Sequence, residues 1–185
     1  MQEVLAQPAA PVGGSGKPLI STRRISRRVH QLGKEISDTY RDADEPLVLI
    51  VVLKGAAVFA SDLLRSLSIP AELEFVRASS YGSGTSSSGR VRFAHLVEGP
   101  LTGRHLLLVE DIVDSGRTIN AIIKQLNRSK PASIRLAALL DRPARREVPV
   151  DIHFTGFRIP DRFVIGYGLD YAGLYRELPA IYSLG

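Results

Sequence analysis

The sequence predicts an α/β fold in which a central, twisted parallel sheet is flanked by helices. Residues 47–53 and 105–109 are almost continuously apolar rather than alternating, which is typical of strands buried on both faces of a parallel sheet. Each run is followed by a helical pattern and then by a further strand pattern. Two strand–helix–strand units in series favour parallel strands joined by right-handed crossovers.

The other elements of the two units follow from shorter patterns. In the first unit we expect a short helix over 56–67, which stops before Pro70, and a strand over 72–78. In the second unit we expect a helix from 117 to about 128 and a strand over 134–140. One face of that second helix is apolar and carries Ile119, Ile122, Ile123 and Leu126.

A longer helix precedes the first unit. Ser21 or Thr22 can cap its first turn. Its apolar stripe recurs at steps of three and four and consists of Ile25, Val29, Leu32, Ile36 and Tyr40. Four arginines lie beside this stripe, and a solvated face explains them most simply: Arg23, Arg24, Arg27 and Arg28.

The remaining segments predict a tail, a hairpin and a cap around one domain. Residues 1–17 are rich in Ala, Pro, Gly and Ser and predict a disordered tail, so that 18–185 form a single domain. Residues 79–89 have almost nothing to bury, and with a return strand over 90–96 they predict a long flexible hairpin. We expect residues 150–185 to cover the strand ends as a small cap.

Composition limits the class of protein. The 185 residues are 44% hydrophobic and 23% charged and include no cysteine, which excludes disulfides and thiolate metal sites. The first residues lack the basic and apolar regions of a signal peptide, and no apolar run would cross a bilayer, so we expect a cytoplasmic protein. The net charge of +5 suits an anionic partner, either nucleic acid or a small phosphorylated substrate.

The segment 106–118, LLLVEDIVDSGRT, carries the chemistry. Its loop follows a buried strand and opens a helix, which places it in the binding crevice of a parallel sheet. Gly116 permits a tight turn, so that backbone N–H groups and the helix N-terminus can converge on one anion. Ser115 and Thr118 add hydroxyl donors and Arg117 adds positive charge. This loop predicts a site for a phosphate monoester.

Two acids precede that loop and need a different ligand. Glu110 and Asp111 would repel a phosphate unless they bind something else. Sugar hydroxyls or a hydrated magnesium ion are suitable ligands for carboxylates. An anion loop beside an acid pair therefore predicts a site for ribose 5-phosphate.

The same segment resembles the phosphoribosyl pyrophosphate signature of the type I phosphoribosyltransferases, in the variant of the hypoxanthine-guanine branch. Three other segments agree in order: 52–55 (VLKG), 79–85 (SSYGSGT) and 161–171 (DRFVIGYGLDY). The resemblance covers about residues 18–185. It implies the fold of that family, with a small hood from the chain ends and a flexible hairpin that closes as a lid.

The resemblance also implies a role for each matching residue. The phosphoribosyl group would be bound by Glu110, Asp111, Asp114, Ser115, Gly116, Arg117 and Thr118. Pyrophosphate would be bound by Leu53, Lys54, Gly55, Ser80, Tyr81 and Arg176, with the Leu53–Lys54 peptide typically cis. The purine would be bound by Arg142, Phe163 and Val164. Metal ligands would be Glu110, Asp111 and Asp170, and the catalytic proton acceptor would be Asp114, near N7 of the purine.

The implied activity is purine salvage with magnesium (Mg2+). The enzyme would transfer phosphoribosyl from phosphoribosyl pyrophosphate to N9 of hypoxanthine or guanine, as a homodimer or homotetramer without membrane or nucleic-acid partners. Arg142 departs from the family's lysine, so the preference among hypoxanthine, guanine and xanthine stays open. The alternatives are a xanthine-preferring enzyme and an RNA-binding transcription regulator with the same fold, which would use the basic face at Arg23–Arg28.

Overall fold

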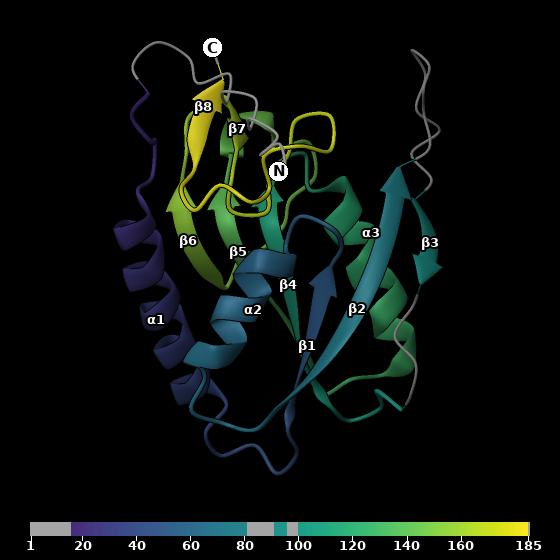
Figure 1. The fold of residues 1–185 in the computed structure, drawn as a ribbon. Helices are drawn as coiled ribbons and strands as arrows, with labels where there is room; N and C mark the ends of the chain where they lie inside the picture. The colour runs from purple at the N-terminus through teal and green to yellow at the C-terminus, as the bar shows by residue number, and fades with distance from the viewer. Residues whose placement is uncertain (1–15, 81–90, 96–99, 185) are drawn as a thin grey trace, which may run out of the picture.

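A computed structural model describes residues 16–80, 91–95 and 100–184. Its central sheet has the strand order β3–β2–β1–β4–β5–β6, and all neighbours are parallel except β3, which is antiparallel to β2 (Figure 1). In chain order, the strands span Leu47–Val52 (β1), Ala71–Ser80 (β2), Val91–His95 (β3), His105–Val113 (β4), Ser133–Asp141 (β5) and Phe154–Arg158 (β6). The parallel α/β prediction is confirmed.

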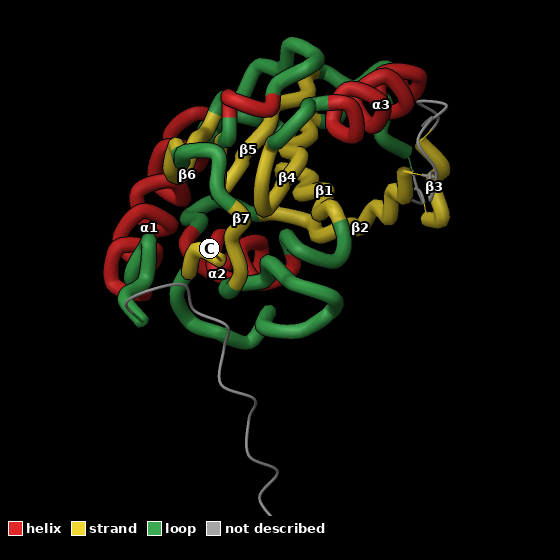
Figure 2. Tube along the Cα trace, turned by 90° about the horizontal axis from the view of Figure 1, so that it is seen from above, coloured by secondary structure: helices red, strands yellow, loops and turns green. Residues whose placement is uncertain are grey.

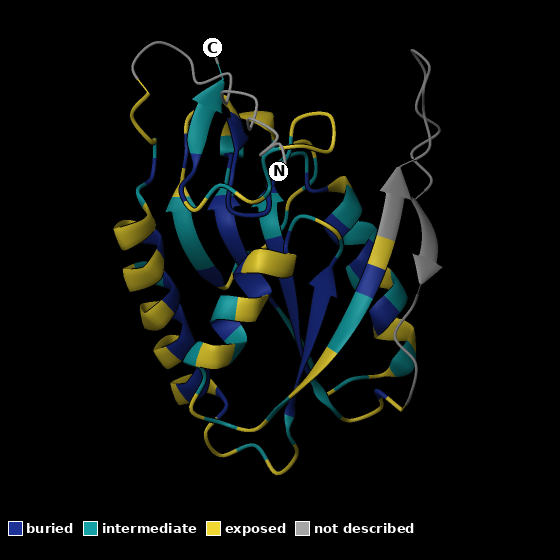
Figure 3. Ribbon diagram, in the orientation of Figure 1, coloured by how far each residue is buried: buried dark blue, intermediate teal, exposed yellow. Residues whose placement is uncertain are grey.

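Helices cover both faces of the sheet. Helices α1 (Thr22–Thr39) and α2 (Ala57–Ser66) pack on one face, and α3 (Arg117–Leu126) packs on the other (Figure 2). The position of β1 explains its continuously apolar sequence. Alternate residues of the strand pack into the hydrophobic cores on the two faces of the sheet, so every residue is buried (Figure 3). The two short 3-10 turns are η1 (Asn127–Ser129) and η2 (Pro143–Arg145).

A small cap lies over the carboxyl ends of the strands (Figure 1). Its antiparallel strands are β7 (Phe163–Ile165) and β8 (Tyr182–Leu184), and a bridge between Ile20 and Ile181 joins the start of the described chain to its end. The predicted cap was too long, because β6 belongs to the main sheet. Strand β6 is the edge strand of that sheet. Arg28 of α1 donates to its Thr155 carbonyl at 2.7 Å and so pairs a backbone acceptor of the sheet edge.

Other boundaries differ for physical reasons. Strand β4 continues past the two acids because its ladder with β5 extends to Val113 and Asp141. Ser21 occupies the N-cap position but makes no side-chain cap, and Thr22 donates instead to the carbonyl of Pro179. The return strand of the hairpin is confirmed as β3. Residues 1–15 of the predicted tail (1–17) and the hairpin tip with Tyr81 lie outside the described residues.

Within the described ranges, no helix combines the length and apolarity that crossing a membrane requires.

Candidate active site

The loop after β4 encloses a cavity of about 250 Å³ at the carboxyl end of the sheet. Gly116 has φ +80°, and a Cβ there would lie 2.5 Å from the carbonyl oxygen of Val148, so only glycine fits. Helix α3 begins at the next residue. The predicted phosphate residues come together here, because the lining includes Glu110, Asp114, Ser115, Gly116 and Thr118. The side chain of Arg117 instead forms an ion pair with Glu147.

The loop presents donors to this cavity. Over the described part of the chain, the backbone N–H groups of Asp114, Ser115 and Gly116 have no protein acceptor. The N-terminus of α3 opens onto the same space, since Thr118 and Ile119 also line it. Free amides at a helix N-terminus favour an anion.

The two acids are adjacent in β4, and their side chains lie on different sides of the strand. Glu110 is buried and lines the cavity, while Asp111 lies against Gly55 in the loop after β1. Burial, and secondly the charge of Asp111, raises the pKa of Glu110 well above its usual value. Burial also raises the pKa of Asp111, although hydrogen bonds and the charge of Arg176 oppose the shift. Two carboxylates held in this way favour a cation or hydroxyl donors as ligands.

The loop after β1 packs closely against the acid pair at Gly55, and the cap packs against this loop at Gly168. The Leu53–Lys54 peptide is cis, as the resemblance implied, and Lys54 is exposed. A Cβ at Gly55 would collide with the carboxylate of Asp111, and a Cβ at Gly168, which has φ +97°, would collide with the carbonyl of Gly55. The 53–55 loop, the acid pair and the cap therefore meet at one place.

Arg176 and Asp170 lie together in the cap. Their side chains form an ion pair with 2.6 Å between Nη2 and Oδ1, and Arg176 also donates to the carbonyl of Gly168 at 2.5 Å. The three predicted metal ligands do not form one cluster, since no group of three or more His, Cys, Asp or Glu side chains suited to a metal occurs among the residues described. Of the predicted pyrophosphate residues, the side chain of Ser80 and all of Tyr81 are outside the description.

Arg142 is buried and engages Asp114 rather than an open pocket. Its Nε donates to Oδ1 of Asp114 at 2.5 Å, its Nη2 donates to Oδ2, and its Nη1 donates to the carbonyl of Arg162 at 2.6 Å. The hydrogen bond from the guanidinium to Asp114 raises the pKa of Arg142. Such a two-point pair fixes both the position and the orientation of the carboxylate. Binding of the purine by Arg142 stays a prediction.

The predicted purine residues occupy the start of β7. Phe163 is 49% exposed, whereas Val164 is buried. Tyr171, itself 53% exposed, meets the edge of the Phe163 ring with 5.9 Å between ring centroids and 88° between planes. A half-exposed aromatic face next to a buried strand is suited to stacking on a planar base.

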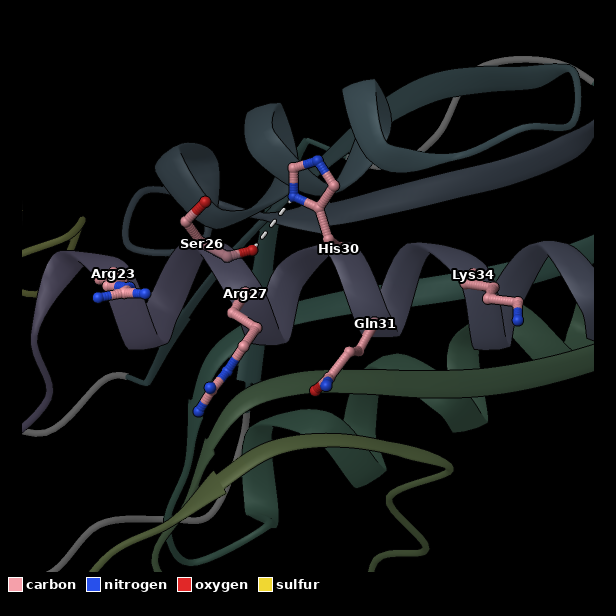
Figure 4. Close-up of a pocket in the computed structure, with 6 residues that line it drawn as sticks. All are labelled: Arg23, Ser26, Arg27, His30, Gln31 and Lys34. Carbon is pink, nitrogen blue, oxygen red and sulfur yellow. Dashed lines mark hydrogen bonds between the residues drawn. The ribbon is translucent and has the colours of Figure 1, made fainter.

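The basic helix face does not form an equivalent site. A hollow of about 530 Å³ is lined by residues of α1 alone, including Arg23, Arg27 and Lys34, and lies along one exposed side of that helix (Figure 4). His30 is turned back toward the carbonyl of Ser26 there. Side chains from a single helix present charge without converging on a ligand, which agrees with a solvated face.

Arg146 and Tyr167 were missed from the sequence. Arg146 hydrogen-bonds to the carbonyls of Val113 and Asp114, and the hydroxyl of Tyr167 donates to Asp62 at 2.6 Å. Burial, and next that bond, raises the pKa of Tyr167. Tyr167 lies in the segment 161–171 that carries the resemblance, but no local pattern specifies the partner of either residue, because the partners lie about 30 and 105 positions away in the sequence. The only signal for Arg146 was a third arginine within five residues after β5.

Comparisons with known proteins agree with this geometry. Residues 19–172 match the phosphoribosyl transferase domain family. The hypoxanthine-guanine phosphoribosyltransferase of Mycobacterium avium is 46% identical over 184 residues, which cover 97% of this chain and 91% of that protein. The hypoxanthine phosphoribosyltransferase of Escherichia coli K12 is 42% identical over 163 residues, 88% of this chain and 92% of that protein.

Solved structures lead to the same family. The hypoxanthine phosphoribosyltransferase of Trypanosoma cruzi superimposes with a TM-score of 0.88 at 38% identity, covering 97% of this chain and 94% of that one. The enzyme of the same name from Staphylococcus aureus gives 0.86 at 35% identity, covering 92% and 91%. The chain therefore belongs to the phosphoribosyltransferase family, as the sequence motifs indicated.

Proposed function

We propose that this chain is a purine-salvage enzyme that transfers the 5-phosphoribosyl group from phosphoribosyl pyrophosphate to N9 of hypoxanthine or guanine. The products are IMP or GMP and pyrophosphate. One observation supports this proposal most strongly: a loop with three amides that have no acceptor among the described residues lies at the end of β4, beside the buried Glu110 and the half-buried Asp111. That pairing suits a phosphate monoester joined to a sugar with free hydroxyls.

The phosphate of the substrate binds at Asp114–Thr118, and its ribose hydroxyls face Glu110 and Asp111. The diphosphate lies toward the 53–55 loop and Arg176, on the side where Gly55 contacts Asp111. Phe163 stacks on the purine, and the backbone of Val164 reads the edge of the base. The other predicted pyrophosphate contacts are Ser80, at the end of β2, and Tyr81, which lies outside the described residues.

Bond making and breaking occur at C1 of the ribose. The bond from C1 to the pyrophosphate oxygen breaks, N9 of the purine forms the new bond to C1, and the electron pair of the broken bond leaves with pyrophosphate. Asp114 accepts the proton that the purine carries on N7, so that no charge remains on the product base. Arg142 holds the carboxylate of Asp114 at both oxygens, which orients it for that transfer.

Glu110 and Asp111 fit a hydrated magnesium ion. Glu110 is buried and Asp111 is half-buried, and neither takes part in an ion pair among the described side chains. Magnesium prefers one or two carboxylates, with water and substrate phosphates completing its shell, so a third protein ligand is not required. When bound, the ion would supply positive charge to the departing pyrophosphate. Asp170, paired with Arg176, would join this shell only by giving up that partner.

Residues 18–185 act as one domain in this proposal, since α1 packs on the main sheet and Ile20 bridges to Ile181 in the cap. We propose a cytoplasmic homodimer or homotetramer. The exposed apolar side chains of Val58 and Leu73 are candidates for subunit contacts. Sedimentation velocity of the purified chain would separate these states from a monomer.

The test is pyrophosphate release with hypoxanthine, guanine, xanthine or adenine, in the presence of phosphoribosyl pyrophosphate and magnesium. We expect turnover with hypoxanthine or guanine and little with adenine, whose amino group is a donor where Arg142 would also donate. Turnover with xanthine alone would replace the proposal by a xanthine-preferring enzyme. No turnover with any base, together with salt-sensitive RNA binding, would point to a regulator.

A further inference from the structure

The three carbonyl groups at the start of the phosphate loop all point toward one segment, 142–148. The carbonyl of Val113 accepts from the amide of Arg142 at 3.1 Å and from Nη2 of Arg146 at 3.1 Å. The carbonyl of Asp114 accepts from Nε of Arg146 at 2.8 Å. We call this segment, which contains η2, the brace.

The brace also holds the next peptide. The carbonyl of Ser115 accepts from the amides of Glu147 and Val148 at 3.0 and 2.9 Å. Gly116 packs directly on the brace, because a Cβ at that position would meet the backbone of Val148 and the side chain of Arg146. Three consecutive peptides are therefore fixed on the same side.

Peptide geometry turns this observation into a statement about the cavity. In a trans peptide, the C=O of one residue and the N–H of the next point in opposite directions. Carbonyls of 113, 114 and 115 that face the brace therefore direct the amides of Asp114, Ser115 and Gly116 away from it. These three amides have no acceptor among the described residues, and they belong to the loop that lines the cavity.

Arg146 is the side chain that hydrogen-bonds to two of these peptides. It is only 19% exposed, and its Nη2 also donates to Oδ1 of Asp141 at 2.6 Å, which anchors the guanidinium. A guanidinium carries five donors in one plane and can serve two carbonyls and a carboxylate at once. Lysine has the charge but not the planar fork.

We propose that Arg146 is a positioning residue that holds the phosphate loop in its anion-binding form before substrate arrives. It acts through the peptides of Val113 and Asp114 and touches no substrate. The inference rests on the proposed function, because it assumes that the free amides bind the 5-phosphate. It predicts a defect confined to the phosphate end of the substrate.

The experiment compares Arg146→Lys and Arg146→Ala with the unaltered chain, using ribose 5-phosphate and pyrophosphate as separate calorimetric probes. We expect the affinity for ribose 5-phosphate to fall about 10- to 100-fold in both variants, since charged hydrogen bonds to two carbonyls are lost. The affinity for pyrophosphate should stay within about 2-fold, because that group lies at the 53–55 loop. The KM for phosphoribosyl pyrophosphate should rise more than kcat falls.

Two further measurements separate positioning from a general loss of structure. Methylguanidinium added to Arg146→Ala should restore part of the ribose 5-phosphate affinity, whereas methylammonium should not. Arg145→Ala is the matched control, because Arg145 is the preceding arginine and pairs with Asp161 at 2.6 Å instead of with the loop. It should bind ribose 5-phosphate as the unaltered chain does.

The outcomes distinguish this inference from the proposed function. If the unaltered chain binds ribose 5-phosphate and Arg146→Lys binds it equally well, the positioning role is wrong and the proposed function stands. If both probes weaken equally in Arg146→Lys, and methylguanidinium restores neither affinity in Arg146→Ala, Arg146 is only structural and the inference is again overturned. An unaltered chain that neither binds ribose 5-phosphate nor releases pyrophosphate overturns the proposed function itself.

Discussion

The two ends of the candidate active site are built in opposite ways. At the phosphate end, the carbonyls of residues 113–115 are tied to the brace, and Gly116 fits against Val148 with no room for a side chain. At the purine end, Phe163 and Tyr171 are about half exposed and meet through a single ring edge. Hydrogen bonds within the protein fix the first end, whereas the second presents open aromatic surface.

This difference suggests a division of labour between binding and selection. A preformed loop loses little conformational entropy on binding, so it can contribute affinity for the phosphate that every substrate shares. The open aromatic pair can adapt to the base, and selectivity depends on the few groups fixed beside it. Asp114 lies between the two ends, since its backbone belongs to the loop and its carboxylate pairs with Arg142.

The largest effect should come from Asp114→Asn, which removes the proton acceptor and one of the two oxygens that accept from Arg142. We expect kcat to fall by about 10²- to 10⁴-fold, the usual contribution of a general base, while the affinity for phosphoribosyl pyrophosphate changes little. Steady-state kinetics with direct binding of phosphoribosyl pyrophosphate would check this. Equal losses in kcat and in the affinity for phosphoribosyl pyrophosphate would show that Asp114 serves binding and not proton transfer.

A smaller but still severe effect should follow from Gly116→Ala, which breaks the preformed end. The methyl group requires a strained positive φ and meets the carbonyl of Val148 at 2.5 Å, so the loop must shift. We expect ribose 5-phosphate affinity to fall by about 10-fold or more, with a loss of stability of roughly 1–3 kcal/mol. Gly103→Ala is the matched control, because Gly103 also has positive φ but no atom near its Cβ position. Unchanged ribose 5-phosphate affinity in Gly116→Ala would contradict the preformed loop.

Phe163→Leu should affect the open end alone. Loss of the aromatic face should raise the KM for the base by about 10-fold, the scale of one stacking contact, and leave ribose 5-phosphate affinity unaltered. Tyr171→Leu, which removes only the edge contact to Phe163, should raise the same KM less. A matching loss of ribose 5-phosphate affinity would show that the two ends are not independent.

The smallest effect concerns stability and pH. Burial raises the pKa of Glu110, so the folded state binds a proton that the unfolded state releases as pH increases. The protonated carboxyl is favourable at low pH, and stability falls as pH rises from the unfolded pKa through the folded one. The glutamine of Glu110→Gln cannot ionise, so this variant should melt at a higher temperature at neutral pH. The increase should be roughly 2–4 °C for each kcal/mol of unfolding free energy that the buried charge costs the unaltered chain.

The melting curves of Glu110→Gln and the unaltered chain should be measured in the presence of a chelator, so that no divalent cation neutralises the acid pair. The gain should shrink toward pH 4 and on addition of magnesium. An equal or lower melting temperature for Glu110→Gln at pH 8 would show that the buried carboxylate carries no electrostatic cost.

The sequence alone predicted the elements whose signals are local. Continuous apolar runs gave β1 and the start of β4, and the loop 114–118 was placed at the strand end because parallel sheets bind ligands there. The residues after β5 were harder. Strand β6 was assigned to the cap because residues 150–185 carry only short strand patterns and turns, and only the ladder with β5 shows that it belongs to the main sheet.

Long-range pairs limited the prediction of the site. Arg142 was identified, but its partner Asp114 lies 28 residues earlier, and nothing in either segment specifies that pair. Arg146 reaches back 32 residues to a carbonyl, which has no sequence signature at all. Likewise, the closeness of Gly55 to Asp111 depends on strands β1 and β4 being neighbours. Hydrogen bonds from side chains to distant backbone groups are therefore the part of the site that local sequence does not predict.

The most direct test is a crystal structure of the chain with inosine monophosphate and magnesium. We expect the phosphate within hydrogen-bond distance of the amides of residues 114–118, the ribose hydroxyls toward Glu110 and Asp111, and the base against Phe163. The phosphate loop should superimpose on the unliganded one, while Phe163 and Tyr171 move. A phosphate bound elsewhere, or a loop that reorganises while the aromatic pair stays fixed, would contradict a preformed phosphate site.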